Sequence, residues 1–187
     1  MKQLILLIAI CLVSGSACNS APDKSAPQQP KVDNSKQVNT EKLKAQAQEL
    51  NDAMITGNYD RAIDLMHPKL VEMAGGKQKL HTAIEEGMKQ VNVVSFKLGE
   101  PRDMFEVNGE WYAIVPNTMS MKVPEGVLVG EGYMVGFSKD KGEHWTFVEA
   151  SGATGTDEKL KFLFPNAGDK LRIPEVKPPV LQKSPSP

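Results

Sequence analysis

The sequence predicts an α+β fold, in which N-terminal helices pack on a curved antiparallel sheet of about five strands. Three observations support this fold class. Apolar residues recur every three or four positions between residues 40 and 90, as they do along one face of a helix. From residue 91 the period changes to two, which is typical of half-buried strands. Asn108 and Gly109 then separate two such segments and indicate a tight hairpin turn.

Three helices are expected before the first strand. The first begins near Thr40, ends at Gly57 and carries an apolar stripe, Leu43, Ala47, Leu50 and Met54. The second ends at His67 because Pro68 follows, and its apolar face is Tyr59, Ala62, Ile63 and Met66. After a short turn with Leu70, Val71 and Met73 and a break at Gly75-Gly76, the third helix carries Leu80, Ile84 and Met88.

The expected strands follow in order. In the first strand, one face carries Val94, Phe96 and Leu98. The segments "MFEV" and "WYAIV" then form the hairpin around the Asn108-Gly109 turn. The run "GVLVGEGYMVGF" makes a long fourth strand, and "HWTFVEA" makes a fifth after the charged turn "SKDKGE".

The predicted fourth strand has two different faces. On one face Glu131 interrupts an apolar row made of Val127, Val129, Tyr133, Val135 and Phe137. The other face includes three glycines that leave the backbone bare, Gly130, Gly132 and Gly136. A closely packed helix, a sharp bend of the strand or a ligand against the backbone would each account for these glycines.

Residues 1–17 have the features of a secretory signal, with Lys2, an apolar run of about ten residues and small residues up to Ala17. Cleavage after Ala17 would make Cys18 the first residue of the mature chain. This stretch resembles the lipobox of bacterial lipoproteins, although Gly15 stands where an aliphatic residue is commonest. The resemblance implies that Cys18 is acylated and that the exported chain is anchored to a bacterial membrane, on its periplasmic or outer surface. The alternative is a soluble periplasmic protein with a spare thiol.

The rest of the chain divides by composition. Residues 18–39 are rich in Pro, Ser, Gln and Asn and are expected to form a flexible, lipid-attached tether. Residues 40–173 have the size of one domain with a single core. Residues 174–187 form a Pro-rich tail, which excludes helix and central strand there. The C-terminal segment either lies extended on the domain or is a disordered arm, and its apolar residues are Leu171, Ile173, Val176 and Val180.

Charge and cysteine content narrow the possible partners. The chain has 22 basic and 23 acidic residues, so no basic surplus would attract nucleic acid. No basic amphipathic face is present to bind anionic lipid, so the acyl group is expected to provide the anchoring. Of the two cysteines, Cys11 lies inside the signal, and Cys18 therefore has no partner for an intramolecular disulfide.

The segment "AMITGNYDRAIDLMHPKLVEMAGGKQKL", together with the hairpin strands and "HWTFVEA", resembles the nuclear transport factor 2-like, or polyketide-cyclase-like, superfamily. The resemblance spans roughly Thr40 to Ala150 and consists of Gly and Pro residues at helix boundaries. It implies a cystatin-like α+β cone whose helices close over a concave sheet, often around a pocket. Homodimers are common in that superfamily, which includes enzymes, ligand binders and scaffolds, so the fold alone does not choose a function.

Few residues suggest catalysis. Glu131 could act as a general acid or base if it lies in apolar surroundings, or it could be an ordinary ion-paired carboxylate. Asp64 precedes His67 by three residues and could orient the imidazole, although His67 is also an unremarkable residue at a helix C-terminus. Tyr133 is the last candidate of this kind. Ligand contacts are expected from Tyr59, Trp111, Glu131 and Tyr133.

No spacing of His and Cys suggests a metal site, and no nucleophile or phosphate-loop motif suggests a cofactor. One of the nine methionines is the initiator, and most of the others are expected at helix or strand core positions. They are interpreted as adaptable core residues and not as a binding surface. The sequence therefore predicts a non-catalytic envelope lipoprotein whose domain binds a small apolar ligand or a protein partner. The alternative is an isomerase, dehydratase or hydrolase of the nuclear transport factor 2-like kind, with a carboxylate or His base. A third possibility is homodimerisation through the sheet.

Overall fold

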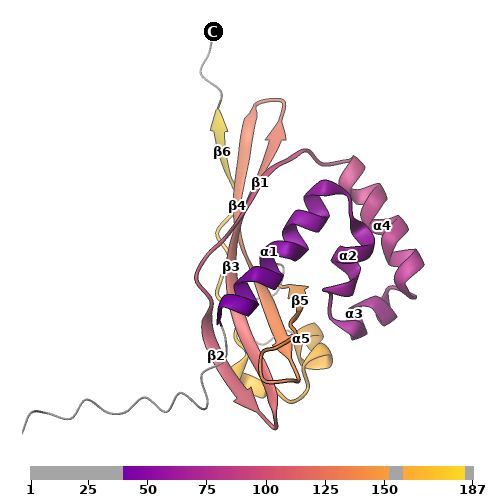
Figure 1. Cartoon of the computed structure of the whole chain (residues 1–187). Helices are drawn as coiled ribbons and strands as arrows, with labels where there is room; N and C mark the ends of the chain where they lie inside the picture. Colours follow the sequence, from indigo (N-terminus) through magenta and orange to yellow (C-terminus); the bar gives the residue numbers. More distant parts are fainter. Residues whose placement is uncertain (1–39, 152–157, 184–187) are drawn as a thin grey trace, which may run out of the picture. The chain divides into compact units, whose positions relative to one another are not determined.

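The computed structural model describes residues 40–151 and 158–183. It is an α+β structure with an open antiparallel sheet, as the sequence predicts (Figure 1). The helices of the described residues are α1 (Thr40–Thr56), α2 (Tyr59–Asp64), α3 (Pro68–Met73), α4 (Lys77–Lys89) and α5 (Glu158–Leu163). The strands are β1 (Val93–Leu98), β2 (Arg102–Val107), β3 (Glu110–Val123), β4 (Gly126–Ser138), β5 (Thr146–Glu149) and β6 (Val180–Lys183).

A long hairpin of β3 and β4 is the centre of the six-stranded sheet, and it pairs continuously from Trp111 opposite Ser138 to Val123 opposite Gly126. Each long strand is flanked on its outer side by two short strands. β2 and β1 pair successive parts of β3, and β5 and β6 pair successive parts of β4. The hairpin therefore has two halves. In the base half, 111–116 of β3 pairs with 133–138 of β4, and in the turn half, 117–123 pairs with 126–132.

Both faces of the base half are covered. On one face, α1 contributes Leu43, Ala47 and Leu50, and these residues pack on Ala113, Val115 and Met134 of the sheet. On the other face, Leu160 and Leu163 of α5 and the segment that follows it cover Tyr112, Ile114, Val135 and Phe137. Figure 1 shows α1, α2 and α4 together on one side of the sheet. The base half is therefore the packed centre of the molecule.

Between residue 40 and the first strand the structure has four helices, where the sequence analysis expected three. Pro68 does follow the end of α2, but it also occupies the first turn of the additional helix α3. A proline is favourable there because the first helical N–H needs no intrahelical acceptor and the ring sets a helical φ angle. His67 is therefore the N-cap of α3, and the expectation that it ends a helix is wrong.

A β-bulge changes the expected face of the first strand. The pairing of β1 with β3 shifts between Val93 and Ser95, so Val93 pairs with Met121 and Phe96 pairs with Met119. Val94 is consequently 56% exposed and does not share a face with Phe96 and Leu98. An unpaired extra residue moves every preceding side chain to the opposite face, which alternation alone does not reveal.

The hairpin turn is confirmed, because Asn108 and Gly109 have φ angles of 53° and 80°. A closely packed helix accounts for the last of the three glycines on β4. A Cβ atom on Gly136 would lie 2.9 Å from Cδ1 of Leu43 in α1. At Gly132 a Cβ would meet Ser151 and Asn117, whereas at Gly130 it would lie 3.6 Å from Cγ of Pro179, which is ordinary contact.

The C-terminal segment lies against the domain over most of its described length. Leu171 and Ile173 are buried in the core under the sheet. β6 pairs with the turn half of β4 and is an edge strand, the kind of strand that a Pro-rich segment tolerates. Val180 does not join the core, since its residue is 64% exposed. The sixth strand is therefore additional to the five that the sequence predicts.

Candidate functional site

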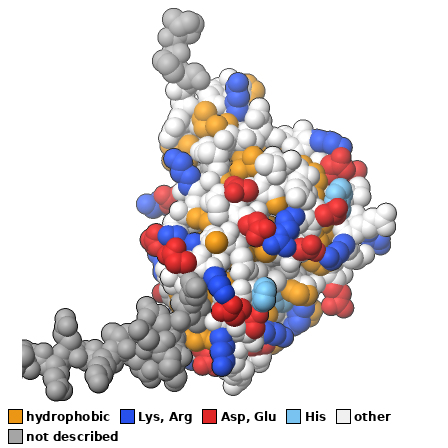
Figure 2. Space-filling view, viewed as in Figure 1, with side chains coloured by type: hydrophobic (Ala, Val, Ile, Leu, Met, Phe, Trp, Pro, Cys, Tyr) orange, Lys and Arg blue, Asp and Glu red, His pale blue; other side chains and the backbone are white. Residues whose placement is uncertain are grey.

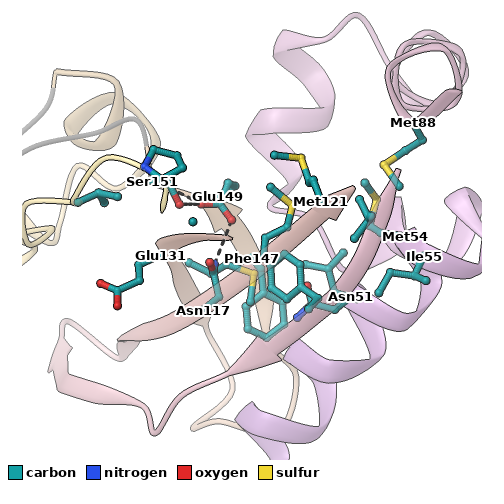
Figure 3. A pocket seen from close by; sticks show the side chains of 18 of the residues that line it. Asn51, Met54, Ile55, Met88, Asn117, Met121, Glu131, Phe147, Glu149 and Ser151 are labelled. Carbon is teal, nitrogen blue, oxygen red and sulfur yellow. Dashed lines mark hydrogen bonds between the residues drawn. The ribbon is translucent and has the colours of Figure 1, made fainter. Parts of the chain in front are cut away.

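A cavity of about 590 Å³ lies between the helices and the turn half of the sheet (Figure 3). Its wall is mostly apolar, and α1, the α2–α3 junction, α4, β1, β3, β4, β5 and the C-terminal segment all contribute to it. Six of the nine methionines line it: Met54, Met66, Met88, Met119, Met121 and Met134. Figure 3 shows Met54 and Met88 reaching in from the helices and Met121 from the sheet. We call this space the methionine cavity.

Local sequence features explain why the space is not filled by side chains. Gly130 contributes no side chain to the floor. On the roof, α4 packs on α2 and α3, and none of its residues is fully buried. Its predicted apolar stripe, Leu80, Ile84 and Met88, is only half-buried. Unbranched methionine side chains can move and adapt around such a space more easily than branched ones.

One buried polar group faces this apolar wall. Asn51 of α1 lines the cavity and is 4% exposed, and its Nδ2 has no hydrogen-bond partner. It lies four residues after Ala47, on the buried stripe of the helix. The sequence analysis missed Asn51. The available signal was an amide side chain within an otherwise apolar stripe, where an unpaired polar group is unfavourable.

A second set of polar side chains, at the rim of the cavity, forms hydrogen bonds among its own members. Asn117 Nδ2 donates to Glu149 Oε2 at 3.3 Å, and the backbone N–H of Ser151 donates to Oε1 of the same carboxylate at 2.9 Å. The Ser151 hydroxyl also bonds Glu149 and accepts from the backbone N–H of Tyr133 at 3.1 Å. Gly132 leaves room for this arrangement. These contacts hold the end of β5 against β4 beside the cavity.

The structure does not bring the four predicted ligand-contact residues together in one site, although Glu131 and Tyr133 both border a small hollow of about 280 Å³. Glu131 lies at the rim of the methionine cavity, is exposed, and directs its carboxylate away from the methionines (Figure 3). Tyr133 packs toward the opposite face of the sheet, with the Arg102 guanidinium 5.0 Å from its ring centre. Trp111 packs in the base half, on the helix side. Tyr59 contacts the ring of His81 beside α4 and is not part of the cavity wall.

Asp64 does not orient His67. The Asp64 carboxylate accepts a hydrogen bond from Lys77, which lowers its pKa. The His67 ring packs against Phe137 and Phe164, which also contact each other, with each ring centre 4.9 Å from that of His67, and its Nδ1 has no hydrogen-bond partner. Burial, together with the nearby Lys69 and Lys139, lowers the pKa of His67 to about 4. The imidazole is therefore neutral at pH 7.

His67 lies in the wall of a second hollow of about 530 Å³ at the base half, which we call the polar pocket. Here Glu110 accepts hydrogen bonds from the Tyr112 hydroxyl at 2.6 Å and from Asn166 Nδ2 at 2.9 Å. Burial raises the pKa of Glu110, but these two bonds and Lys139 outweigh it, so the net shift is downward. Burial and the bond to Glu110 raise the pKa of Tyr112.

The polar side chains on the opposite rim of the polar pocket also form hydrogen bonds with one another. Asp140 accepts from the Ser138 hydroxyl at 2.8 Å and from the backbone N–H of His144 at 2.9 Å, and it contacts Nδ1 of that histidine at 2.6 Å. Partial burial acts to raise the pKa of Asp140, but these bonds dominate and lower it to about 2. The two carboxylates of this pocket therefore serve as hydrogen-bond acceptors for its own residues.

The described residues hold no cluster of three or more His, Cys, Asp or Glu side chains that could bind a metal ion. Within the same residues, every helix is too short or too polar to cross a bilayer. Cys18 and the predicted tether lie outside the described residues. On the face shown in Figure 2, acidic and basic side chains are interspersed and do not gather by sign.

Comparison with known proteins found no family model, no curated protein and no solved structure that matches this chain.

Proposed function

We propose that this chain is an envelope lipoprotein whose folded domain binds a small apolar ligand in the methionine cavity. The observation that supports this most directly is the cavity itself, whose volume of about 590 Å³ lies within the usual range of small-molecule sites. Its lining is apolar with few polar groups, the pattern by which such sites obtain affinity from burial and specificity from single hydrogen bonds.

The six methionines favour an adaptable site. Thioether side chains are flexible and polarizable, so they can repack around ligands of somewhat different shape. Each methylene of a ligand that leaves water contributes roughly 0.8 kcal/mol before the entropic costs of binding are subtracted. Either an acyl chain or a compact ring system would gain binding free energy by burying its apolar surface against this lining.

The arrangement of the catalytic candidates favours binding over catalysis. A catalytic site needs an acid, a base or a nucleophile directed at one point. Glu131 is directed away from the cavity, Tyr133 packs toward the other face of the sheet, and His67 packs against two aromatic rings in the polar pocket. Glu131 and Tyr133 border a separate small hollow of about 280 Å³, whereas His67 lies in the polar pocket. The three candidates therefore do not line one cavity, and this arrangement favours the binding proposal over the enzyme alternative.

We also propose membership of the nuclear transport factor 2-like superfamily. Helices over one face of an antiparallel sheet, with a cavity between the two layers, support this assignment. The four helices before β1, the helix α5 and the edge strand β6 are features that a cone of three helices and five strands does not require. Homodimerisation through the sheet stays a prediction.

Lipid attachment is the second part of the proposal. Acylation of Cys18 would place the domain at a bacterial membrane surface, where apolar ligands are plentiful. Wild-type protein is expected in the membrane fraction after incorporation of labelled palmitate, and a Cys18→Ala variant is expected unlabelled in the soluble fraction. Wild-type protein that leaves the cells without membrane treatment would contradict the anchor.

Ligand binding can be tested with the neutral apolar dye N-phenylnaphthylamine, whose fluorescence rises in an apolar site. We expect saturable binding by the wild type and about tenfold weaker binding by Met121→Gln, because a ligand must then desolvate an unpaired amide. The matched control is Met73→Gln, since Met73 is 57% exposed and does not line the cavity. Equal binding by both variants would place the dye elsewhere and contradict the proposed site.

A further inference from the structure

We infer that the C-terminal segment 174–183 is a movable strap that closes one side of the methionine cavity, and that a ligand enters after β6 separates from β4. The inference rests on the proposed ligand-binding function and identifies the part of the chain that controls access to the site. We call this segment the C-terminal strap. Three of its residues line the cavity: Val176, Lys177 and Pro179.

The path of the C-terminal strap leads around the outer edge of β4, from one face of the sheet to the other. Leu171 and Ile173, which precede it, are buried in the core on the face that α5 covers. Val176 and Pro179 line the cavity, which lies on the helix face. β6 then pairs with 126–129 along the edge of β4 (Figure 1). The strap therefore closes the cavity at this edge of the sheet.

Burial of the chain ends where the C-terminal strap begins. Leu171 and Ile173 are each 3% exposed, whereas every residue from 174 to 183 is half-buried or exposed. In β6, Val180 is 64% exposed and Leu181 is 39% exposed. Segments that bury little apolar surface open locally at a small cost in free energy while the core stays folded. Ile173 is therefore a fixed end from which the strap can move.

The wall that the C-terminal strap provides is thin. Lys177 and Pro179 line the cavity and are also exposed to solvent, so one stretch of chain separates the cavity from water there. The stretch 174–179 forms no helix or strand, and its three prolines have no N–H to donate to the sheet. The backbone pairing of β6 with 126–129 is thus the regular attachment of the strap to the sheet.

The edge of β4 is adapted to this pairing. At Gly126, a Cβ atom would overlap the backbone carbonyl oxygen of Gln182, so the two strands approach more closely there than a side chain would allow. The closed position of the strap is therefore a defined seat on the sheet, although its exposed residues make the seat easy to leave.

A disulfide between β4 and β6 tests the inference. Leu128→Cys and Leu181→Cys are introduced together into the full mature chain with Cys18→Ser, because these leucines are opposite each other and neither lines the cavity. Tyr133 directs its N–H and its C=O to the outer side of β4. By alternation, Leu128 is in a non-hydrogen-bonded pair, which has the closer spacing that a disulfide needs.

The readout is the rate at which N-phenylnaphthylamine associates in stopped-flow fluorescence. The chain oxidised with diamide is expected to bind the dye at least about tenfold more slowly than the same chain after reduction, because opening of the strap controls entry. The two single-cysteine variants cannot form the bridge within one chain and should not respond to the oxidant.

A second variant loosens the C-terminal strap without changing the cavity wall. Val180→Gly combined with Leu181→Gly lowers the strand propensity of β6, so the dye should associate and dissociate about 3- to 10-fold faster. The matched control is Val94→Gly, since Val94 is 56% exposed on β1, the opposite edge of the turn half, and does not line the cavity. Both rates of the control should stay within about twofold of the parent chain.

The possible outcomes separate the inference from the proposed function. Equal rates for the oxidised and reduced forms, with unchanged rates in the glycine variant, would overturn the inference and leave the proposed function standing, because the ligand would then enter elsewhere, such as beneath α4. If the two cysteines do not form the bridge, the glycine variant and its control decide the question. Failure of the parent chain to bind the dye would instead overturn the proposed function.

Discussion

The base half and the turn half of the β3–β4 hairpin belong to the same two strands but differ in packing. In the base half, 112–115 of β3 and 134–138 of β4 are buried. The rings of Tyr112, Phe137 and Phe164 contact one another there, with centres 5.4–5.9 Å apart. In the turn half, most residues are only half-buried, and methionines face a cavity. One continuous hairpin thus supplies a rigid core at one end and an adaptable wall at the other.

The largest expected effect is the loss of a ring from the packed half. Phe164→Ala is expected to lower the free energy of unfolding by about 3–5 kcal/mol, because a 1% exposed ring leaves a cavity among fixed neighbours. Met121→Ala, at a half-buried position beside the cavity, should lower the free energy of unfolding by clearly less than Phe164→Ala does. Urea unfolding of both variants measures the difference. Equal losses would mean that the two halves are packed alike.

The next effect is acid sensitivity centred on His67. Its pKa is about 4 in the folded protein and ordinarily near 6.5, so unfolding takes up a proton between these values. The contribution of the neutral imidazole to the free energy of unfolding is therefore fully present above about pH 6.5. It is lost as the pH falls toward 4, and the total loss is about 3 kcal/mol. His67→Phe should remove this component from the pH profile of stability. His81→Phe, which changes a histidine beside Tyr59, should keep it. Identical profiles for both variants would contradict burial of a neutral imidazole.

A smaller effect is expected from the glycines of β4. Gly136→Ala should destabilise by about 1–3 kcal/mol, since its Cβ would lie 2.9 Å from Leu43, a residue with no room to move in the core. Gly130→Ala, beside the cavity, should be neutral or stabilising by up to about 1 kcal/mol because nothing lies closer than 3.6 Å. Thermal unfolding of the pair tests this. A destabilising Gly130→Ala would show that the floor of the cavity is tightly packed.

The smallest effect is expected at α4. Met88→Ala should change the free energy of unfolding by about 1 kcal/mol or less, because this side chain is half-buried and borders the cavity. The same variant should weaken binding of N-phenylnaphthylamine severalfold through lost contact. Chemical unfolding and dye titration on one sample separate the two effects. A loss of 3 kcal/mol would assign α4 to the rigid core instead of the adaptable wall.

Much of the secondary structure could be predicted from local patterns. The stripe of Leu43, Ala47 and Leu50 is buried as the helical period indicates, and α1 does end before Gly57, whose φ angle is 78°. The Asn108-Gly109 turn and the two long strands also follow from local rules. These features depend on neighbours along the chain, so sequence spacing carries the information.

The candidate site was less predictable. The methionines were assigned to the core by their positions, because periodicity identifies a buried face but not whether that face meets side chains or a cavity. Asn51 was not singled out at all. The misplacement of Val94 has a similar cause, since one bulge reverses a face. His67 was interpreted as a helix end, and its burial against Phe137 and Phe164 depends on a segment about 100 residues later.

By itself, the sequence determined the α+β class, the Asn108-Gly109 turn and the types of the longer elements, because each depends on backbone preferences and on periodicities a few residues long. The short elements α3, α5 and β6 were not predicted. Tertiary structure decided which parts of the sheet are packed and which are hollow. That outcome depends on how the volumes of α1, α4 and the C-terminal segment match the sheet, as the contact of Leu43 with the bare backbone at Gly136 illustrates. Volume matching is a property of elements distant in the chain, and no local pattern records it.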